Sequence, residues 1–218
     1  MHMVKLSIAK IIAGLSIVVG CMVMVGWYLD ITVITSILPQ WIRMKFATAA
    51  CFVFSGIIVY ALSWGKEKWK EARQIILTIF PALVVLVMGT LFLGSVFGFQ
   101  TGMENIAFID VHEIATPIFQ GRPSVATMVS FLLIATIGLL FNFNRTTRKT
   151  FSVIGAIVGT IGFVGVVGYL TNMHTLYYEI PGFSNAIAIH TTILFALLGV
   201  AIYLIGQGQE EQPYEDQA

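Results

Sequence analysis

Long apolar runs alternate with short polar segments along the whole chain. A helix that crosses a bilayer needs about 20 mainly apolar residues, and six runs come close to that length. They lie at about Leu6–Tyr28, Lys45–Trp64, Gln74–Phe97, Val125–Phe143, Phe151–Leu170 and Ala186–Ile205. The pattern predicts an all-α integral membrane protein in which residues 1–206 form one domain of six transmembrane helices. Pro81 lies inside the third run, where we expect it to kink the helix.

One short motif recurs where the second, fourth and sixth runs begin. Each copy places a threonine at the start of the run, a few residues after a proline-containing turn. The copies are Ala47-Thr48-Ala49, Ala126-Thr127-Met128 and His190-Thr191-Thr192. The recurrence predicts three repeated helical hairpins with the three threonines at matching depth.

The first run also has features of a secretory signal. Lys5 and Lys10 precede it, and Val18-Val19-Gly20-Cys21 resembles a lipoprotein cleavage box. A mature lipoprotein normally becomes polar after the cysteine, whereas this run continues through Met22-Val23-Met24-Val25. We therefore expect an uncleaved first helix.

Lysine and arginine are distributed unevenly between the two sides of the predicted bundle. One side carries nine: Lys5, Lys10, Lys66, Lys68, Lys70, Arg73, Arg145, Arg148 and Lys149. The other side carries three: Arg43, Lys45 and Arg122. Basic segments stay on the cytoplasmic side, so both termini are predicted to be cytoplasmic. The acidic tail 207–218 is predicted to be disordered, and the protein to lie in the inner (plasma) membrane.

Composition supports this membrane assignment. The 218 residues are 57% hydrophobic and 11% charged, whereas soluble domains carry about 25% charged residues. A net charge of +1 gives no footprint for nucleic acid. Cys21 and Cys51 are the only cysteines in the sequence and lie in apolar runs. We expect two small buried hydrophobic residues and no disulfide.

Glycines recur through the fifth run at steps of three and four residues. They are Gly155, Gly159, Gly162, Gly165 and Gly168. A glycine face lets two helix backbones approach closely. The pattern predicts tight packing of this helix at the centre of the bundle, with a hinge for motion as the alternative.

The motifs at the turns resemble the polytopic N-terminal membrane sensor regions of bacterial and archaeal histidine kinases and diguanylate cyclases. The resemblance covers about residues 20–206. It rests on Gly26-Trp27 with Asp30, Met44-Lys45 with Thr48-Ala49, Gly121-Arg122 with Ser124 and Thr127, and Pro181-Gly182 with His190-Thr191. It implies a sensory membrane domain, here without the output domain that normally follows in that group.

Several candidate metal ligands fall on the predicted outer side. They are His112, His174, His190 and Glu113, with Asp110, Glu104 and Glu179 on the same side. Imidazoles and carboxylates gathered on one face bind zinc, copper or another transition metal. His174 and His190 also flank the last outer loop, as a pair of haem ligands would. The alternative is that these loop histidines are satisfied by solvent or by backbone groups.

Polar residues at the outer helix ends are the other candidate ligand-binding groups. Thr48, Thr127 and Thr191 would form a polar ring, or else bond to their own helices. His190 would line a ligand site or make a structural hydrogen bond, because polar groups at membrane depth face the bundle interior. Arg122 and Lys45 would meet an anion, or pair with Glu113, Asp110 or lipid headgroups.

The sequence favours a sensory or ligand-binding membrane module. It would detect a small molecule or ion at its outer face and signal to a cytoplasmic partner. The alternatives are an accessory structural subunit of a larger membrane complex, or an outer-face metal- or haem-binding protein. An enzyme is the least supported class, because no nucleophile–base pair or phosphate-binding loop is present in the sequence.

Overall fold

The computed structural model describes residues 2–38, 41–64, 69–104, 121–178, 180 and 184–208. This part of the chain is helical and contains no strand, apart from one isolated antiparallel bridge between Ile180 and Ser184. The helices are α1 (His2–Tyr28), α2 (Thr32–Ser36), α3 (Phe46–Leu62), α4 (Lys70–Val84), α5 (Thr90–Phe97), α6 (Val125–Asn142), α7 (Arg148–Thr171) and α8 (Ile189–Gly208). A π-helical turn, Val85–Gly89, joins α4 to α5, and a 3₁₀ turn, His174–Tyr177, follows α7.

Five helices of the described chain are long and apolar enough to cross a membrane. They are α1, the continuous helix α4–α5, α6, α7 and α8. The run predicted at Lys45–Trp64 contains α3, an apolar helix of 17 residues. At 1.5 Å per residue, α3 is about 25 Å long, somewhat less than the roughly 30 Å of a hydrocarbon core. The fold is therefore that of a multi-pass helical membrane protein.

Several helices extend beyond the apolar runs that predicted them. α1 begins at His2 rather than Leu6, and α7 begins at Arg148 rather than Phe151. Thr147 and Thr150 form a capping box at the start of α7, which stabilises a helix end outside the apolar run. α8 continues to Gly208, past the expected boundary of the membrane domain. Apolarity marks the part of a helix inside the lipid, whereas capping decides where the helix begins.

A π-helical turn follows Pro81, the residue at which the sequence predicted a kink; the kink itself stays a prediction. Pro81 is buried inside α4, and Val85–Gly89 follows four residues later. Proline has no N–H to donate to the carbonyl of Leu77, so the regular ladder is interrupted there, and π-turns are a known site of helix bending. Gly138 of α6 packs on this segment, because a Cβ atom there would lie 3.0 Å from Cγ of Pro81.

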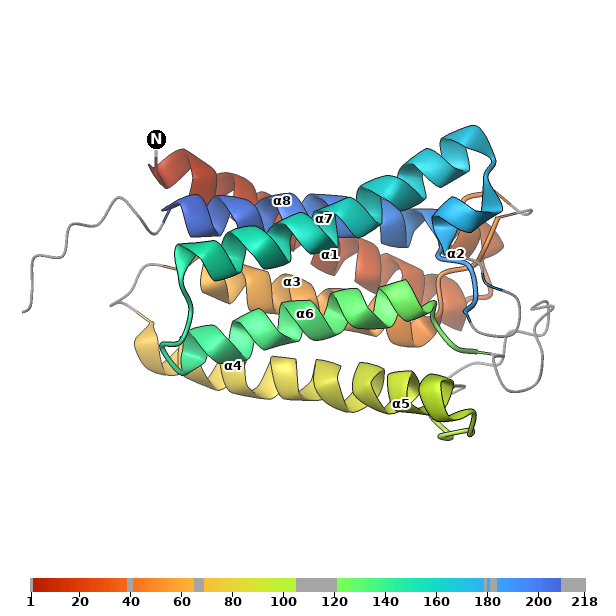
Figure 1. The fold of residues 1–218 in the computed structure, drawn as a ribbon, viewed down its shortest axis with the longest axis horizontal. Helices are drawn as coiled ribbons and strands as arrows, with labels where there is room; N and C mark the ends of the chain where they lie inside the picture. The colour runs from red at the N-terminus through yellow and green to blue at the C-terminus, as the bar shows by residue number, and fades with distance from the viewer. Residues whose placement is uncertain are drawn as a thin grey trace, which may run out of the picture.

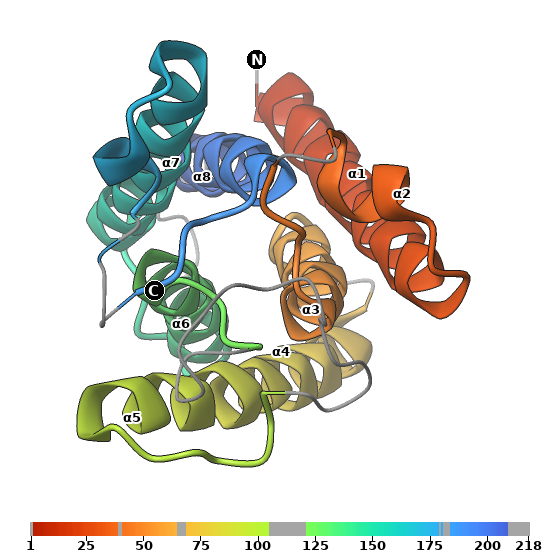
Figure 2. The ribbon, with the colours of Figure 1, turned by 90° about the vertical axis from the view of Figure 1, so that its right-hand side faces the viewer.

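The long helices form an inner and an outer set (Figures 1 and 2). Viewed along the bundle, α3, α6 and α8 lie inside, and α1, α4–α5 and α7 lie outside (Figure 2). Each outer helix packs against two inner ones: α1 against α3 and α8, α4 against α3 and α6, and α7 against α6 and α8. The core therefore lies among the three inner helices.

Three phenylalanines form a triangle at the centre of this core. Phe52 of α3, Phe131 of α6 and Phe195 of α8 are each fully buried. The ring centroids are 4.8 Å apart for Phe52 and Phe131 and 4.9 Å apart for the other two pairs. Such distances are typical of favourable aromatic packing. The triangle ties one inner helix to the other two.

Glycines bring α7 and α8 into backbone contact. A Cβ atom added to Gly155 would lie 2.8 Å from the carbonyl oxygen of Gly199, and one added to Gly199 would lie 2.7 Å from the carbonyl oxygen of Gly155. The close approach expected of the fifth run is present. It occurs on an outer helix against α8, not at the bundle centre, because the glycine face of α7 is turned toward one neighbour.

We expect Gly199→Ala to destabilise the fold by about 1–3 kcal/mol, the usual cost of overpacking. The added methyl group would meet backbone atoms, which cannot rotate away, so α7 and α8 must separate. Gly14→Ala is the matched control, because a Cβ atom there meets nothing within 4 Å and alanine favours a helix by about 1 kcal/mol. Thermal unfolding of the purified protein in detergent measures both. Equal stability of the two variants would contradict the backbone contact.

Both cysteines are free, but their environments differ. Cys51 is buried in α3 as expected, whereas Cys21 is exposed on α1. The expectation of two buried cysteines was therefore wrong for Cys21. Its position on the outer surface of α1 places it on the lipid-facing side, where a small apolar side chain is equally well accommodated.

Candidate ligand site at one end of the bundle

The three inner helices all begin at the same end of the bundle. We call this end the loop end; α1, α5 and α7 finish there, and α3, α6 and α8 start there (Figure 1). The opposite end, where α4 and α7 start, is called the basic end. The sequence-predicted site residues that the structure describes belong to the loop end, so its geometry decides what they can do together.

The three predicted threonines occupy the same place in their helices. Thr48, Thr127 and Thr191 are each the third residue of an inner helix, and each is buried, with 2–3% of its surface exposed. Each also precedes a phenylalanine of the central triangle by four residues. Residues four apart lie on the same helix face. The threonines therefore lie one turn above the triangle, on the faces that line the core.

Hydrogen bonding distinguishes Thr127 from the other two. Ser124 caps α6, accepting a bond from the Thr127 N–H at 3.1 Å, and its hydroxyl lies 2.7 Å from the Thr127 hydroxyl. Within the described chain, the hydroxyls of Thr48 and Thr191 make no hydrogen bond. The hydroxyl of Thr127 is thus used in capping α6. The hydroxyls of Thr48 and Thr191 can form hydrogen bonds with a ligand.

His190 is the second residue of α8 and is half-buried. Its Nδ1 atom is buried and has no hydrogen-bond partner among the described residues. A buried polar atom without a partner costs about 1–3 kcal/mol. The carboxylates proposed as its partners, Glu113 and Glu179, lie outside the described residues. His190 is therefore an imidazole that can hydrogen-bond, or coordinate, a group entering from the loop end.

The remaining predicted metal ligands are not placed by the structure. His112, Glu113 and Asp110 fall outside the described residues, and for His174 only the backbone, in the 3₁₀ turn, is described. Within the described ranges, no three histidine, cysteine or acidic side chains gather in a way that would hold a metal ion. A metal or haem site that uses these histidines stays a prediction.

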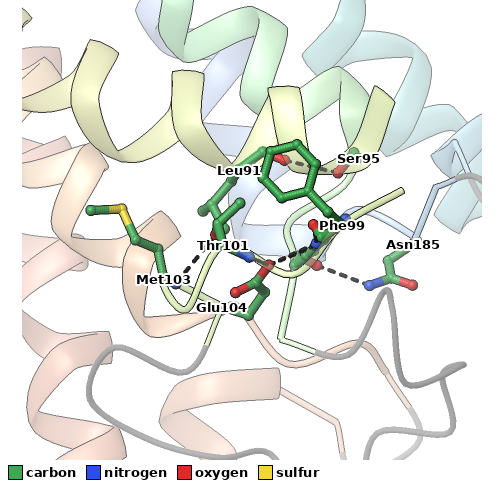
Figure 3. Close-up of polar contacts among 8 residues, drawn as sticks. Leu91, Ser95, Phe99, Thr101, Met103, Glu104 and Asn185 are labelled. Atoms are coloured by element: carbon green, nitrogen blue, oxygen red, sulfur yellow. Dashed lines mark hydrogen bonds and ion pairs between the residues drawn. The ribbon is translucent and has the colours of Figure 1, made fainter. Parts of the chain in front are cut away.

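Arg122 is fully buried and forms an ion pair with Glu104, which is labelled in Figure 3. Its Nε and Nη2 atoms donate to the same carboxylate oxygen, Oε1 of Glu104, at 3.1 and 2.7 Å. Nη2 also donates to the carbonyl oxygen of Phe99. The Glu104 side chain is 7% exposed. Arg122 is therefore buried rather than extended to lipid headgroups, and Glu104 is its ionic partner among the described residues. Glu113 and Asp110, the partners considered from sequence, lie outside the described residues.

The segment around Arg122 also holds the last loop. Asn185 donates from Nδ2 to the carbonyl oxygen of Arg122 at 2.9 Å (Figure 3). The hydroxyl of Ser184 accepts a bond from the Val125 N–H at 3.1 Å, which satisfies a backbone donor at the start of α6. Glu104, Arg122 and Asn185 thus join the loops that precede α6 and α8.

The first loop is fixed by Trp27 and Arg43. Trp27 donates from Nε1 to the carbonyl oxygen of Met44 at 2.8 Å, and the Arg43 guanidinium lies 4.4 Å from the Trp27 ring centre. Arg43 also donates from Nε to the hydroxyl of Thr35 at 3.0 Å. The cation–π contact and hydrogen bonds together orient the chain that enters α3. Lys45, the N-cap residue of α3, is half-buried next to this cluster.

Aromatic side chains connect the first loop to the last. Trp41 packs edge-on against Tyr169 of α7, with ring centroids 5.3 Å apart, and Tyr169 stacks on Tyr177 at 4.6 Å. The Tyr169 hydroxyl donates to the carbonyl oxygen of Ile187 at 2.7 Å. The N–H of Ile187 donates to the carbonyl oxygen of Tyr177 at 2.9 Å. The loop before α8 is thus attached to the loops before α3 and α6. These contacts between the three loops fix the start of α8.

The Glu104 pair predicts a pH dependence of stability. Burial alone raises the pKa of this carboxyl, but hydrogen bonds from backbone groups, first from Thr101, and from Arg122 hold the pKa below its ordinary value of 4.5. The stability from this lowered pKa is fully present above the ordinary value and is lost as pH falls through the folded-state pKa. At pH values below about 4, we expect the unfolding midpoint of the wild type in detergent to decrease with falling pH. The decrease should be steeper than that of Glu104→Gln. Parallel curves would contradict this.

Sequence reasoning missed the partners of Arg122 and the aromatic triangle. A signal was present: Arg43 and Arg122 each precede one of the threonines by five residues, and a phenylalanine follows each threonine by four. The shared pattern is R-x-x-x-A-T-x-x-x-F. Ser184 and Asn185 have no such signal, because their role depends on a contact between loops distant in sequence.

Comparison with protein-family models, curated proteins and solved structures finds no match to this chain. The loop end is the part of the described chain that bears on function. The described groups there are an imidazole with a buried unpartnered nitrogen, two threonine hydroxyls, and a buried arginine already paired with Glu104. Groups of these kinds can accept or donate hydrogen bonds to a small polar molecule, and an imidazole can coordinate an ion.

Proposed function

We propose that this protein is an integral membrane sensory or ligand-binding module. It detects a small molecule or ion at the loop end, which faces outward, and signals to a cytoplasmic partner. The observation that carries the proposal is the buried, unpartnered Nδ1 atom of His190, beside Thr191 at the start of α8. A ligand that supplies the missing partner would offset the cost of burying that nitrogen.

Helix α8 offers a route from the ligand to the cytoplasmic side. His190 lies in its first turn, and Gln207 lies in its last. At the basic end, Lys5 of α1 donates to the carbonyl oxygen of Gln207 at 3.4 Å, and Arg148 of α7 donates to the Gln207 side chain. A shift of α8 on ligand binding would change these contacts with both neighbouring helices, which provides the differential interaction that signalling requires.

The proposal includes a topology of six spans as three repeated hairpins, with both termini in the cytoplasm. It is supported by the basic bias between the two ends and by the common position of the three threonines in α3, α6 and α8. It also agrees with the resemblance to sensor regions of histidine kinases and diguanylate cyclases, in which such a domain reports to a cytoplasmic output.

Cysteine labelling tests the topology. In a background carrying Cys21→Ala and Cys51→Ala, single cysteines replace Met3, Phe143 or Met173, which are 78%, 68% and 50% exposed. A membrane-impermeant maleimide applied to intact cells should label only the Met173 variant, because Met3 and Phe143 lie at the basic end. Labelling of Met3 and Met173 from the same side would refute the arrangement.

Zinc binding tests the site. The wild-type protein, purified in detergent, should show a rise in its unfolding midpoint with micromolar Zn²⁺ that His190→Ala abolishes, since the imidazole is the proposed ligand. Ile193→Ala, an exposed change one turn further along α8, is the matched control. A visible absorbance spectrum of the same sample tests the alternative that the protein binds haem.

Other results would favour the alternatives. A ligand screen in which neither Zn²⁺ nor any small molecule distinguishes the wild type from His190→Ala would remove the ligand-binding proposal. A stable complex with other membrane proteins, unchanged in composition by His190→Ala, would instead favour an accessory structural subunit.

A further inference from the structure

Among the described residues of the basic end, positive charge is not evenly neutralised. Lys5 and Arg148 are both engaged with Gln207, where they hold the C-terminal end of α8. By contrast, Lys70, Arg73 and Arg145 have no carboxylate partner among the described residues. The uncompensated cations come from α4 and from the connection between α6 and α7, which lie side by side at this end (Figure 1).

Three contacts hold the start of α4, the end of α6 and the start of α7 together. The Arg73 guanidinium lies 5.2 Å from the ring centre of Phe141 in α6, and that ring packs edge-on against Phe151 of α7 at 6.1 Å. Asn142 donates from Nδ2 to the hydroxyl of Thr78 in α4 at 2.9 Å. The aromatic ring fixes the arginine head group by a cation–π contact, so the charge is held in place before any ligand arrives.

The guanidinium of Arg73 is incompletely compensated. Its Nη1 atom is buried and has no hydrogen-bond partner among the described residues. A partly buried charge without an ionic partner is unfavourable, and an anion beside it would remove that cost. Arg145 follows Asn144, which has a φ of 54°, and its own N–H donates to the carbonyl oxygen of Leu140 at 2.8 Å. The backbone that carries the second arginine is therefore also fixed.

Aromatic and apolar residues set the depth of this cluster in the membrane. Trp69, directly before Lys70, is 57% exposed and packs near Trp64 with ring centroids 6.4 Å apart. Exposed tryptophan is typical of the headgroup level of a bilayer. Two residues beyond Arg73 the outward face of α4 becomes apolar, with Ile75 and Ile79 exposed by 59% and 49%. The cations thus lie where lipid phosphates lie, above a surface suited to acyl chains.

We propose that Lys70, Arg73 and Arg145 form a binding site for the phosphate headgroup of an anionic phospholipid, whose acyl chains lie along α4. The site is independent of the ligand site at the loop end. Basic pockets between membrane helices are suited to anionic headgroups, and arginine supplies several donors to phosphate oxygens. The bound lipid would hold α4 to the α6–α7 connection at the end where the proposed signal leaves the bundle.

Lipid titration of the purified, delipidated full chain tests the proposal. The unfolding midpoint is followed with phosphatidylglycerol, and separately with phosphatidylcholine of the same chain length. We expect the wild type to bind phosphatidylglycerol more tightly. Arg73→Gln and Arg145→Gln should each weaken that binding about fivefold, as expected for one cation near an anionic headgroup. Arg145 is exposed in a connection, so its variant keeps the test valid if Arg73→Gln folds poorly.

Lys10→Gln is the matched control, since it removes one charge from the same end on a different helix. It should bind phosphatidylglycerol as the wild type does. A weakening equal to that of the arginine variants would overturn the proposal in favour of diffuse charge. Equal binding of the two lipids would overturn it as well. Stabilisation by inorganic phosphate that Arg73→Gln abolishes, without any lipid preference, would replace the lipid with a free anion.

Discussion

Replacing Arg122 by methionine should destabilise the protein by about 3–5 kcal/mol, the usual cost of breaking a buried ion pair from one side. Arg122 is 1% exposed and donates twice to Oε1 of Glu104. Without it, the carboxylate would remain buried at 7% exposure with no cation beside it. The carbonyl oxygen of Phe99 would also lose the donor it has in Nη2. Chemical or thermal unfolding in detergent measures the loss.

Two further variants separate the ion pair from the general effect of removing an arginine. Arg145→Met, measured in detergent without anionic phospholipid, should change stability by less than about 0.5 kcal/mol, as surface substitutions usually do. The double variant Arg122→Met with Glu104→Leu should recover part of the loss, because no buried charge is left unpaired. If the double variant loses more stability than the two single variants lose together, the broken Arg122–Glu104 pair is not the cause of the loss in Arg122→Met.

The pair also has a place in the architecture of the loop end. Glu104 precedes and Arg122 follows the segment 105–120, which contains His112 and Glu113. The same arginine accepts a hydrogen bond at its carbonyl oxygen from Asn185, near the start of α8. Arg122→Met removes the side-chain bonds to Glu104 and Phe99 but keeps the carbonyl oxygen that Asn185 binds. The backbone at position 122 would be less firmly fixed, and so would the last loop that Asn185 attaches to it. We expect the His190-dependent zinc response to weaken in Arg122→Met even below its unfolding temperature.

Most of the fold could be predicted from the sequence because lipid imposes a simple constraint. A backbone inside the hydrocarbon core must satisfy its own hydrogen bonds, so each long apolar run has to be a helix. The limits of the helices were less accessible. α7 starts at Arg148, before its apolar run, because the Thr147 capping box adds a turn outside the lipid. α3 is shorter than the run that predicted it.

The site was predicted less completely, since it depends on contacts between distant segments. Thr48, Thr127 and Thr191 were recognisable from a repeated motif, and the structure places each as the third residue of an inner helix. The partner of Arg122 was not recognisable, because Glu104, Asp110 and Glu113 are equivalent choices in a sequence. The local turn at Thr101, whose N–H donates to Glu104 at 2.8 Å, orients the Glu104 carboxylate toward Arg122 and could not be read from the sequence.

Truncation of the central triangle should also have a large effect. We expect Phe131→Ala to destabilise the protein by about 3 kcal/mol, at the lower end of the range for a buried phenylalanine. Lipid is as apolar as the core, so the transfer part of that range is small and the lost packing dominates. Phe131 contacts both Phe52 and Phe195 at centroid distances of 4.8 and 4.9 Å, so a cavity there loosens all three inner helices.

Phe163→Ala provides the matched control, because Phe163 is 64% exposed on α7 and its removal leaves no cavity. Its effect should be less than about 0.5 kcal/mol. In addition, Phe52→Ala and Phe195→Ala should be non-additive with Phe131→Ala, since residues that share a cavity are coupled. Because the three threonines lie one turn above these rings, Phe131→Ala should also weaken zinc binding through His190. Additive losses with unchanged zinc binding would show that the triangle and the loop end are independent.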